Sequence, residues 1–392
     1  MISVSKALSI ISEVSYTPKV KTVPLKGTNG LVLSKNIDSS IHMPPFRQSA
    51  MDGYALLLHD KNTYQIIGEV KAGDPDDYSL LPGQGVRIFT GARVPNNANT
   101  VVIQEKVIRS EDIITVHGEV NKNQNIRAIG EQIKKGDIAL AKGTKLSPAG
   151  IGFLSGLGVN EVQVFTPPSV AIITTGNELI PPGQKLQEGK IYESNSLQLQ
   201  SVLEQSKIKK INKYIVQDEY ESTKETIRQA IINNDLVLIS GGISVGDYDF
   251  VKEALSELRT EELFYKIKQK PGKPLFFGRN NKTLIFALPG NPASSLTCYY
   301  IYVIPVIQKM MGTITSLGLK RTMKSLTEDF VKKGDRAQFL KAKTSEESVE
   351  VLEGQSSAML YSYAVADALV FIPENINQID KNSLVETILL PQ

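Results

Sequence analysis

Two turns in the second half of the sequence have residue types that suit phosphate binding. The first follows the apolar run 236–240 and contains Ser240, Gly241, Gly242, Ser244 and Gly246. Glycines between a strand and a helix expose backbone N–H groups beside the positive end of the helix. The spacing fits neither the dinucleotide fingerprint nor the Walker loop, so a plain tight connection is an equally good interpretation.

The second turn follows the apolar run 284–288 and reads Pro289, Gly290, Asn291, Pro292. Pro292 pre-sets the first turn of a helix, and the neighbouring N–H groups could meet an anion. Taken alone, such a turn is more often a rigid joint between a strand and a helix.

Several lysines lie between the two turns: Lys266, Lys268, Lys270 and Lys273. If residues 266–270 form an extended strand, the first three of these lysines share one face. A run of this kind is usually a solvated edge that discourages aggregation. Its place a short loop from two candidate phosphate turns makes anion binding an equally good hypothesis.

Three carboxylates follow segments predicted as strand or turn: Glu178, Asp218 and Asp249. In a doubly wound sheet the ligand binds at the carboxyl ends of the strands. Carboxylates beside phosphate suit Mg²⁺, a hard cation that proteins hold through one or two carboxylates plus phosphate oxygens. For any one of these residues, a surface acid or a helix cap is the simpler interpretation.

The first half of the chain contributes polar loop residues of the types that bind ligands. Asp52 lies in the loop 44–54, Thr90 follows a short apolar run, and Arg127 precedes a glycine and a glutamate. Residue type alone does not identify what these loops bind.

Alternating strands and helices from residue 170 to 311 must position the turns and the carboxylates. The pattern predicts strands at 170–174, 213–217, 236–240 and 284–288, and helices at 194–205, 221–233, 250–258 and 293–311. Such alternation predicts an α/β domain with a doubly wound, largely parallel sheet covered on both faces. Short β-like runs flank it, at 64–70, 85–89, 100–107 and 113–116 before it and at 322–326, 337–342, 348–352 and 368–372 after it. Residues 1–14 have the periodicity of an amphipathic helix.

Composition excludes several classes of function. Cys298 is the only cysteine, beside three histidines, which excludes a disulfide framework and disfavours a zinc site of Cys and His ligands. The formal net charge of +3 is too small to favour nucleic acid or an anionic membrane. No run approaches the ~20 apolar residues that span a bilayer. We therefore expect a cytoplasmic protein that binds neither nucleic acid nor membrane.

Taken in order, these segments resemble the molybdopterin molybdenumtransferases, the bacterial molybdenum insertases related to the E domain of gephyrin. The stretches that carry the resemblance are 49–55, 87–92, 126–131, 174–179, 192–196, 240–249, 270–274 and 289–293. The resemblance implies a multi-domain α/β protein with an all-β insert, an elongated stem and a C-terminal β-barrel-like domain. The implied boundaries are an N-terminal helix at 1–20, a stem at 21–39 and 138–167, an all-β domain at 40–137, a molybdopterin-binding α/β domain at 168–312, and a C-terminal β domain at 313–392.

The resemblance also implies a function, the Mg²⁺-dependent insertion of molybdate into adenylylated molybdopterin with release of AMP. The implied catalytic residues are Asp52, Thr90, Arg127, Glu178, Lys266 and Lys270. Mg²⁺ is expected on Asp218 and Asp249, while Glu178 either holds metal or orients water. The expected substrate-binding residues are Ser240, Gly241, Gly242, Ser244, Gly246, Lys273, Pro289 and Pro292. A homodimer is implied, with a molybdopterin adenylyltransferase as upstream donor and acceptor molybdoenzymes or their chaperones downstream.

Two positions depart from the family's pattern. Asn177 stands where an acid usually precedes Glu178, which could weaken a metal contact. Ile239 replaces the first serine of a pair, and we expect it only to pack.

Three alternatives remain beside the insertase. A molybdopterin adenylyltransferase carries a similar serine–glycine loop, but the segments before Thr166 argue against it. Tungstate has nearly the size and charge of molybdate and could be the oxyanion inserted. A non-enzymatic scaffold, a role that gephyrin's E domain also has, would have little need to keep the acids at 52, 218 and 249 together with both lysines.

Overall fold

The computed structural model describes residues 1–75, 78–243, 250–314 and 316–391. The chain forms two compact units, one of residues 1–21 and 165–392 and the other of residues 22–164. The finer division expected from the sequence stays a prediction. Within the described ranges, no helix has both the length and the apolar character that crossing a bilayer requires.

A six-stranded sheet forms the centre of the first unit, in the order β16-β13-β17-β21-β20-β18. Its parallel strands are β13 (Val170–Thr175), β16 (Ile211–Val216), β17 (Leu236–Ser240) and β21 (Thr283–Leu288). At one edge it continues with the antiparallel strands β20 (Phe276–Asn280) and β18 (Glu261–Tyr265). The predicted doubly wound, largely parallel sheet is confirmed, whereas the two edge strands were not predicted.

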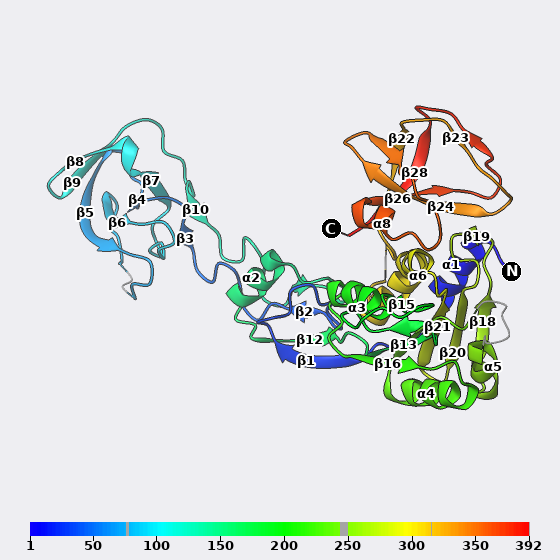
Figure 1. Ribbon diagram of the computed structural model, residues 1–392. Coiled ribbons are helices and arrows are strands. Elements are labelled where there is room, and N and C mark those ends of the chain that lie inside the picture. The colour runs from blue at the N-terminus through cyan, green and yellow to red at the C-terminus, as the bar shows by residue number, and fades with distance from the viewer. Residues whose placement is uncertain (76–77, 244–249, 315, 392) are drawn as a thin grey trace. The chain divides into compact units, whose positions relative to one another are not determined.

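Helices cover both faces of this sheet because its strands are apolar on both faces. Along β13, Val170 and Ile172 enter one core, and Ala171 and Ile173 enter the other. Figure 1 shows α4 and α5 on one side of the sheet and α1, α3 and α6 on the other. The bounds of these helices are α1 (Val4–Glu13), α3 (Asn195–Gln205), α4 (Tyr220–Asn233), α5 (Phe250–Glu257) and α6 (Pro292–Cys298). Ile239 is fully buried in the second core, as expected for a residue that only packs.

The predicted helix at 293–311 is confirmed in position but is not α-helical throughout. It consists of α6, a π-helical segment (Tyr299–Val303) and α7 (Ile304–Met310). Pro305 lies at the start of α7, and proline has no N–H to donate and clashes with the preceding turn of an α-helix, so a wider turn relieves both problems. Gly312 lies two residues after the end of α7; it has φ +83, and a Cβ there would lie 1.9 Å from Phe165 Cδ2.

The C-terminal part of this unit is a closed five-stranded barrel. The strands pair in the ring β24-β25-β22-β28-β26, and β26 returns to β24. Their bounds are β22 (Arg321–Leu326), β24 (Ala337–Thr344), β25 (Ser348–Val351), β26 (Ala368–Ile372) and β28 (Leu384–Leu389). Smaller elements accompany the ring: β19 (Gln269–Lys270), β23 (Phe330–Val331), α8 (Tyr361–Val365) and β27 (Gln378–Ile379). The predicted barrel-like domain is therefore confirmed.

The second unit contains a six-stranded sheet in the order β7-β4-β6-β5-β9-β8. Its strands are β4 (Gly53–Leu56), β5 (Thr63–Val70), β6 (Gln84–Ile88), β7 (Thr100–Ile103), β8 (Val107–Ser110) and β9 (Ile113–Val116). The single strand predicted at 100–107 is divided, because a 3₁₀ turn at Gln104–Lys106 redirects the chain between β7 and β8. The other elements between residues 20 and 165 are β1 (Val20–Pro24), β2 (Ile37–Asp38), β3 (Gln48–Ser49), β10 (Ile126–Arg127), β11 (Ile138–Leu140), α2 (Pro148–Gly156) and β12 (Glu161–Phe165).

Candidate active site

A pocket of about 670 Å³ lies at the carboxyl ends of the parallel strands. The strands end at the same level because Thr174 pairs in register with Ser240, and Ser240 with Leu288. Of the residues predicted for the site, it is lined by Glu178, Asp218, Ser240, Gly241, Gly242, Pro289 and Pro292. The two candidate phosphate turns and two of the three predicted metal-binding acids thus lie around one pocket.

Asp218 is held by the residue at which the sequence departs from the family's pattern. The backbone N–H of Asn177 donates to Asp218 Oδ2 (3.0 Å), and the backbone N–H of Asp218 donates to Asn177 Oδ1 (3.1 Å). This reciprocal pair joins the segments that follow β13 and β16. Asn177 therefore positions the Asp218 carboxylate.

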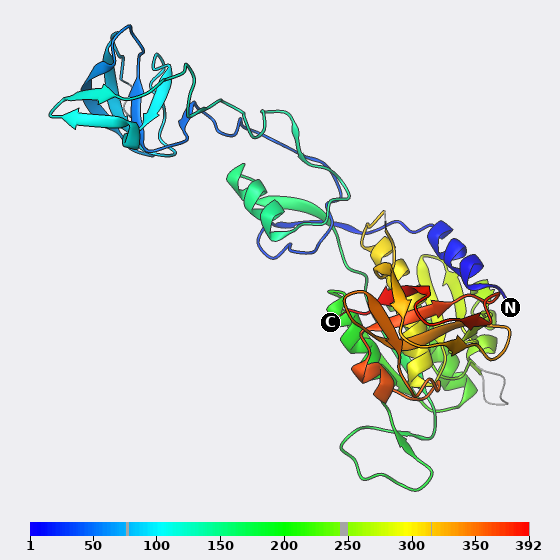
Figure 2. The ribbon, with the colours of Figure 1, turned by 90° about the horizontal axis from the view of Figure 1, so that it is seen from above.

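Glu178 lies over a glycine that has no room for a side chain. Gly176 has φ +151, and a Cβ there would lie 2.8 Å from Glu178 Oε2. Any larger residue at position 176 would displace the carboxylate. Beyond it, β14 (Leu179–Ile180) and β15 (Ile191–Tyr192) pair at the base of an exposed loop, which projects from the α/β domain in Figure 2.

The first turn also requires glycine at two consecutive positions. Gly241 has φ +99, and a Cβ there would lie 2.8 Å from the carbonyl oxygen of Thr175. Gly242 has φ +60, and a Cβ there would lie 2.8 Å from Val251 Cγ2. Only a residue without a side chain allows the turn to approach β13 and α5 this closely.

Asn195 links the two turns, a role that was not predicted. Its side-chain N–H₂ group donates to Ser240 Oγ (2.8 Å) and to the carbonyl oxygen of Gly290 (2.7 Å). The stretch 192–196 belongs to those that carry the family resemblance, which is the signal that could have identified this residue.

Three polar atoms of the pocket lining are buried and have no hydrogen-bond partner among the described residues. They are Thr174 Oγ1, Thr175 Oγ1 and Asn195 Oδ1. Buried polar groups are nearly always paired, so a cluster of unpaired ones in a pocket indicates that a ligand or water completes them. Neither threonine was predicted, although both end a strand that is otherwise built of Val, Ala and Ile.

The charge of the lining decides which ligands this pocket can take. Glu178, Glu193 and Asp218 line it, and its described lining residues include no lysine or arginine. Glu193 is occupied by Ser196, whose backbone N–H and hydroxyl both donate to it. An anionic group would meet the other two carboxylates, and a hard cation between them would turn this repulsion into attraction.

The residues described do not complete a metal site by themselves. Among them, no group of three or more Asp, Glu, His or Cys side chains could hold a metal ion. Mg²⁺ commonly needs only one or two carboxylates together with phosphate oxygens, which Glu178 and Asp218 fit. The predicted metal ligand Asp249 and the predicted substrate contacts Ser244 and Gly246 lie outside the described residues.

Residues 266–270 do not form the extended strand in which Lys266, Lys268 and Lys270 would share one face. β18 ends at Tyr265, Lys266 has φ +62, and β19 contains only Gln269–Lys270. A left-handed residue interrupts the alternation of an extended strand, so the lysines do not share one face. Lys268 instead lies 3.5 Å from the carboxylate of Asp335.

Lys266 does not line the pocket and is connected to its wall through Tyr265. Its ammonium lies 4.7 Å from the centre of the Tyr265 ring, and the Tyr265 hydroxyl donates to the carbonyl oxygen of Ile243 (3.2 Å). Ile243 lines the pocket at the end of the glycine turn. Lys270 and Lys273 are exposed, and neither is among the described residues of the lining.

Asp52 and Thr90, both in the second unit, contact each other directly. The backbone N–H and the hydroxyl of Thr90 each donate to Asp52 Oδ1 at 2.7 Å. These two bonds, with a smaller effect from the Arg87 charge, lower the pKa of the Asp52 carboxyl below its ordinary value. Asp52 is therefore an exposed, firmly ionised acid at the surface of this unit.

Arg127 joins the same face through Gln48. Its guanidinium donates to Gln48 Oε1 (3.3 Å), and Gln48 Nε2 donates to the carbonyl oxygen of Gly91 (3.1 Å), next to Thr90. The short strands β3 and β10 set this contact by pairing Arg127 with Gln48. The three residues predicted from the first half of the chain thus form one exposed polar cluster.

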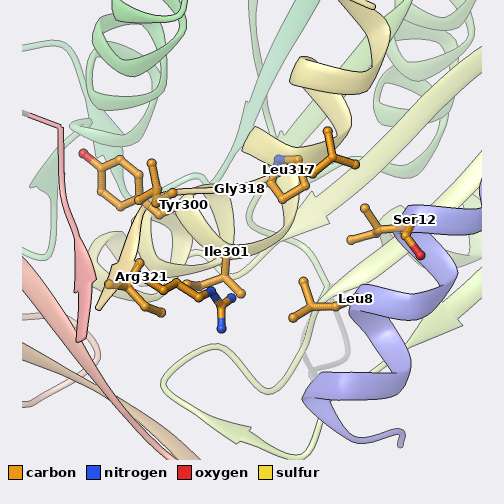
Figure 3. Close-up of a pocket in the computed structure, with 11 residues that line it drawn as sticks. Leu8, Ser12, Tyr300, Ile301, Leu317, Gly318 and Arg321 are labelled. Carbon is orange, nitrogen blue, oxygen red and sulfur yellow. The ribbon is translucent and has the colours of Figure 1, made fainter. Parts of the chain in front are cut away.

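A second pocket, of about 220 Å³, has a different character. Figure 3 shows Leu8 and Ser12 of α1 facing Ile301, Leu317 and Arg321 across it. The Arg321 guanidinium is paired with Glu386. This lining is largely apolar, its described residues include no carboxylate for Mg²⁺, and its guanidinium is already paired, so this pocket is not the candidate active site.

Comparison with known families covers nearly the whole chain. Residues 2–158 match the model of the MoeA N-terminal region (domain I and II). Residues 171–309 match the probable molybdopterin binding domain, and residues 325–390 match the MoeA C-terminal region (domain IV).

Relatives and solved structures agree with these matches. The chain is 35% identical to the molybdopterin molybdenumtransferase of Haemophilus influenzae, over 80% of this chain and 78% of that protein. It is 31% identical to that of Staphylococcus aureus, over 97% and 93%. The crystal structure of the molybdopterin biosynthesis MoeA protein from Pyrococcus horikoshii OT3 superposes with a TM-score of 0.85 at 29% identity, over 99% of this chain and all of that one. On this evidence, the chain belongs to the MoeA family of molybdopterin molybdenumtransferases.

Proposed function

We propose that this enzyme inserts molybdate into adenylylated molybdopterin, uses Mg²⁺ as its cofactor and releases AMP. Membership of the family supports a molybdopterin ligand and a role in making the molybdenum cofactor. The observation that carries the finer proposal is the composition of the pocket. Two carboxylates and unpaired hydroxyls surround two glycine- and proline-containing turns, which suits a pyrophosphate group with a divalent cation.

Charge supports a requirement for Mg²⁺. Pyrophosphate and molybdate are both anions, and the described lining of the pocket is itself acidic. We infer that Asp218 and Asp249 would hold Mg²⁺, that Glu178 would either join them or orient water, and that the cation would supply positive charge to offset the negative charge of the pyrophosphate. The reciprocal bonds with Asn177 would keep the Asp218 carboxylate facing the cation. Glu178 has the alternative role of orienting the attacking water.

The remaining residues would bind and orient the anions. Ser240, Gly241, Gly242, Pro289 and Pro292 form the walls against which the pyrophosphate would lie. Ser244 and Gly246, from the same turn, would contribute to substrate binding, and Lys266, Lys270 and Lys273 would contribute positive charge. The positive charges would offset the repulsion between the two anions.

We assign the polar cluster of Asp52, Thr90 and Arg127 to the pterin and molybdate end of the substrate. The family resemblance supports a homodimer, in which the cleft involves both subunits. A molybdopterin adenylyltransferase would supply the substrate, and acceptor molybdoenzymes or their chaperones would take the product. We expect these steps to take place in the cytoplasm.

One assay tests the proposal directly. The protein is incubated with adenylylated molybdopterin and Mg²⁺, with and without molybdate, and AMP is measured. We expect release of AMP that depends on both Mg²⁺ and molybdate. If AMP does not depend on molybdate, the proposed reaction is wrong, and tungstate in its place tests the alternative oxyanion.

Neutralising the acids tests the metal site. Asp218→Asn and Asp249→Asn should lower the rate of AMP release by roughly ten- to a hundredfold, the loss expected for one charge-assisted contact. The fold should remain, because asparagine is nearly isosteric with aspartate and, at position 218, its amide oxygen can still accept the bond from Asn177. Added Mg²⁺ should recover part of the rate. Glu204→Gln, at an exposed position of α3, is the matched control and should be fully active. Full activity of both asparagine variants would remove these acids from the site.

A further inference from the structure

A lysine of the C-terminal barrel is buried without a counter-ion. Lys341, in β24, is 2% exposed, and among the described residues no carboxylate forms an ion pair with it. Burial lowers the pKa of its ammonium group. A buried charge is costly unless it is fully hydrogen-bonded, so such a residue has a specific set of acceptors.

The acceptors of Lys341 all belong to one loop. Its ammonium donates to the backbone carbonyl oxygens of Gly354 (2.6 Å), Ser356 (3.2 Å) and Met359 (3.2 Å). An ammonium has three N–H donors, and each of them has a carbonyl oxygen here. The ammonium therefore gathers residues 354–359 around a single point.

Gln355, a residue of the same loop, binds the backbone of Lys341. Gln355 Oε1 accepts from the Lys341 backbone N–H (3.0 Å), and Gln355 Nε2 donates to the Lys341 carbonyl oxygen (2.9 Å). The loop is thus attached to both the side chain and the backbone of position 341.

The far side of this loop forms part of the pocket. Ser357 Oγ accepts from Asn291 Nδ2 (3.0 Å), and the Ser357 carbonyl oxygen accepts from the backbone N–H of Ser294 (3.2 Å). Ala358 lines the pocket together with Asn291 and Pro292. The barrel thereby supplies one wall of a pocket whose other walls come from the α/β domain.

We propose that Lys341 is a positioning residue for the reaction. It holds residues 354–359 against the turn at 289–292, so that this wall of the pocket is already in place before the adenylylated ligand binds. This inference rests on the proposed function, because it takes that pocket to be the substrate site. Lys341 itself does not line the pocket and acts through Ser357 and Ala358.

The test replaces Lys341 with methionine, an apolar side chain of nearly the same length. Hydrogen exchange of the segment 353–360 should become faster by roughly tenfold or more, because three bonds from a charged donor are lost. The KM for adenylylated molybdopterin should rise by roughly tenfold while kcat changes little, the pattern of lost binding in the ground state. The melting temperature of each variant reports whether the fold is intact.

Two further variants make the result specific. Lys343→Met removes an exposed lysine of the same strand, which pairs with Asp367, and should leave both exchange and KM unchanged. Ser357→Ala removes the hydroxyl that accepts from Asn291 but keeps the carbonyl contact, so KM should rise by less than in Lys341→Met.

The outcomes separate this inference from the proposed function. If Lys341→Met leaves exchange in 353–360 unchanged, Lys341 does not hold the loop. If exchange rises while KM stays the same, the loop is not a wall of the substrate site and the positioning role is refuted. If the unaltered enzyme releases no molybdate-dependent AMP, the proposed function fails, while the exchange experiment still decides whether Lys341 holds the loop.

Discussion

Replacing Thr175 with valine should make the free protein more stable and, at the same time, a weaker binder of its ligand. Thr175 ends β13 and lines the pocket, and its hydroxyl is buried without a hydrogen-bond partner among the described residues. Valine has nearly the same shape but carries a methyl group in place of the hydroxyl. The substitution therefore removes an unpaired polar atom and leaves no cavity.

The magnitude follows from the chemistry of that hydroxyl. An unpaired buried hydroxyl costs about 1–3 kcal/mol, so the free energy of unfolding should rise by about 1–2 kcal/mol. For a unit of this size, the melting temperature should rise by roughly 2–8 °C. If the hydroxyl donates to a phosphate oxygen in the complex, its loss should weaken binding of adenylylated molybdopterin by roughly ten- to a hundredfold.

Calorimetry of the free protein and titration with the ligand give the two values. Ser295→Ala is the matched control, because Ser295 Oγ is also buried and unpaired among the described residues but Ser295 does not line the pocket. It should gain stability and keep its affinity. A less stable Thr175→Val protein would mean that the hydroxyl is satisfied in the free state. An unchanged affinity would show that no ligand atom reaches it.

Three other perturbations test separate parts of the site. Thr90→Val should raise the pKa of Asp52 part of the way to its ordinary value, since the backbone bond from residue 90 remains; NMR titration measures it. A lowered carboxyl pKa stabilises the folded protein at pH values above the ordinary pKa of about 3.9, and this stability is lost as the pH falls through the pKa of the folded state. The variant has less of this stability, so it should lose less on acidification. Lys270→Ala should weaken binding of adenylylated molybdopterin by roughly ten- to a hundredfold but leave bare molybdopterin nearly unaffected, as calorimetric titration of both ligands would show; equal losses would mean that Lys270 contacts another group. Gly241→Ala should lower the melting temperature and abolish AMP release, because its Cβ would lie 2.8 Å from the Thr175 carbonyl oxygen; an active, equally stable variant would contradict the tight turn.

Much of the fold could be predicted because its central strands are continuous apolar runs that end in glycine, proline or polar residues. The bounds of β17, β9 and β26 correspond closely or exactly to the predicted ones. The edge strands β18 and β20 were missed because they mix charged, aromatic and glycine residues. Lys266, Lys268 and Lys270 do not share the face that an extended strand would give them, because Lys266 has a left-handed backbone conformation that its residue type does not indicate.

The site was predictable only in part, for a similar reason. Acids and glycines at strand ends identify themselves by type, and Glu178, Asp218, Gly241 and Gly242 do line one pocket. Thr175 differs from an ordinary threonine in a strand only because its buried hydroxyl has no hydrogen-bond partner among the described residues. Hydrogen-bond partners are known only once the chain is folded, so the sequence could not single out this residue. The same holds for Lys341, whose burial inside a loop of carbonyl oxygens could not be inferred from a lysine in a β-strand.

The packing of α1 has a consequence for how the protein is made. During synthesis this helix leaves the ribosome long before α7 does, yet its apolar residues Ala7 and Ile11 belong to the core that α7 completes. Lys309 donates to the carbonyl oxygen of Ser12 at 2.5 Å across 297 positions of sequence. At ~5–20 residues per second, synthesis of that stretch takes roughly 15–60 s. Residues 22–164 can fold during this interval, while the apolar stripe of α1 stays exposed to chaperones, and docking of α1 can only be a late step of folding.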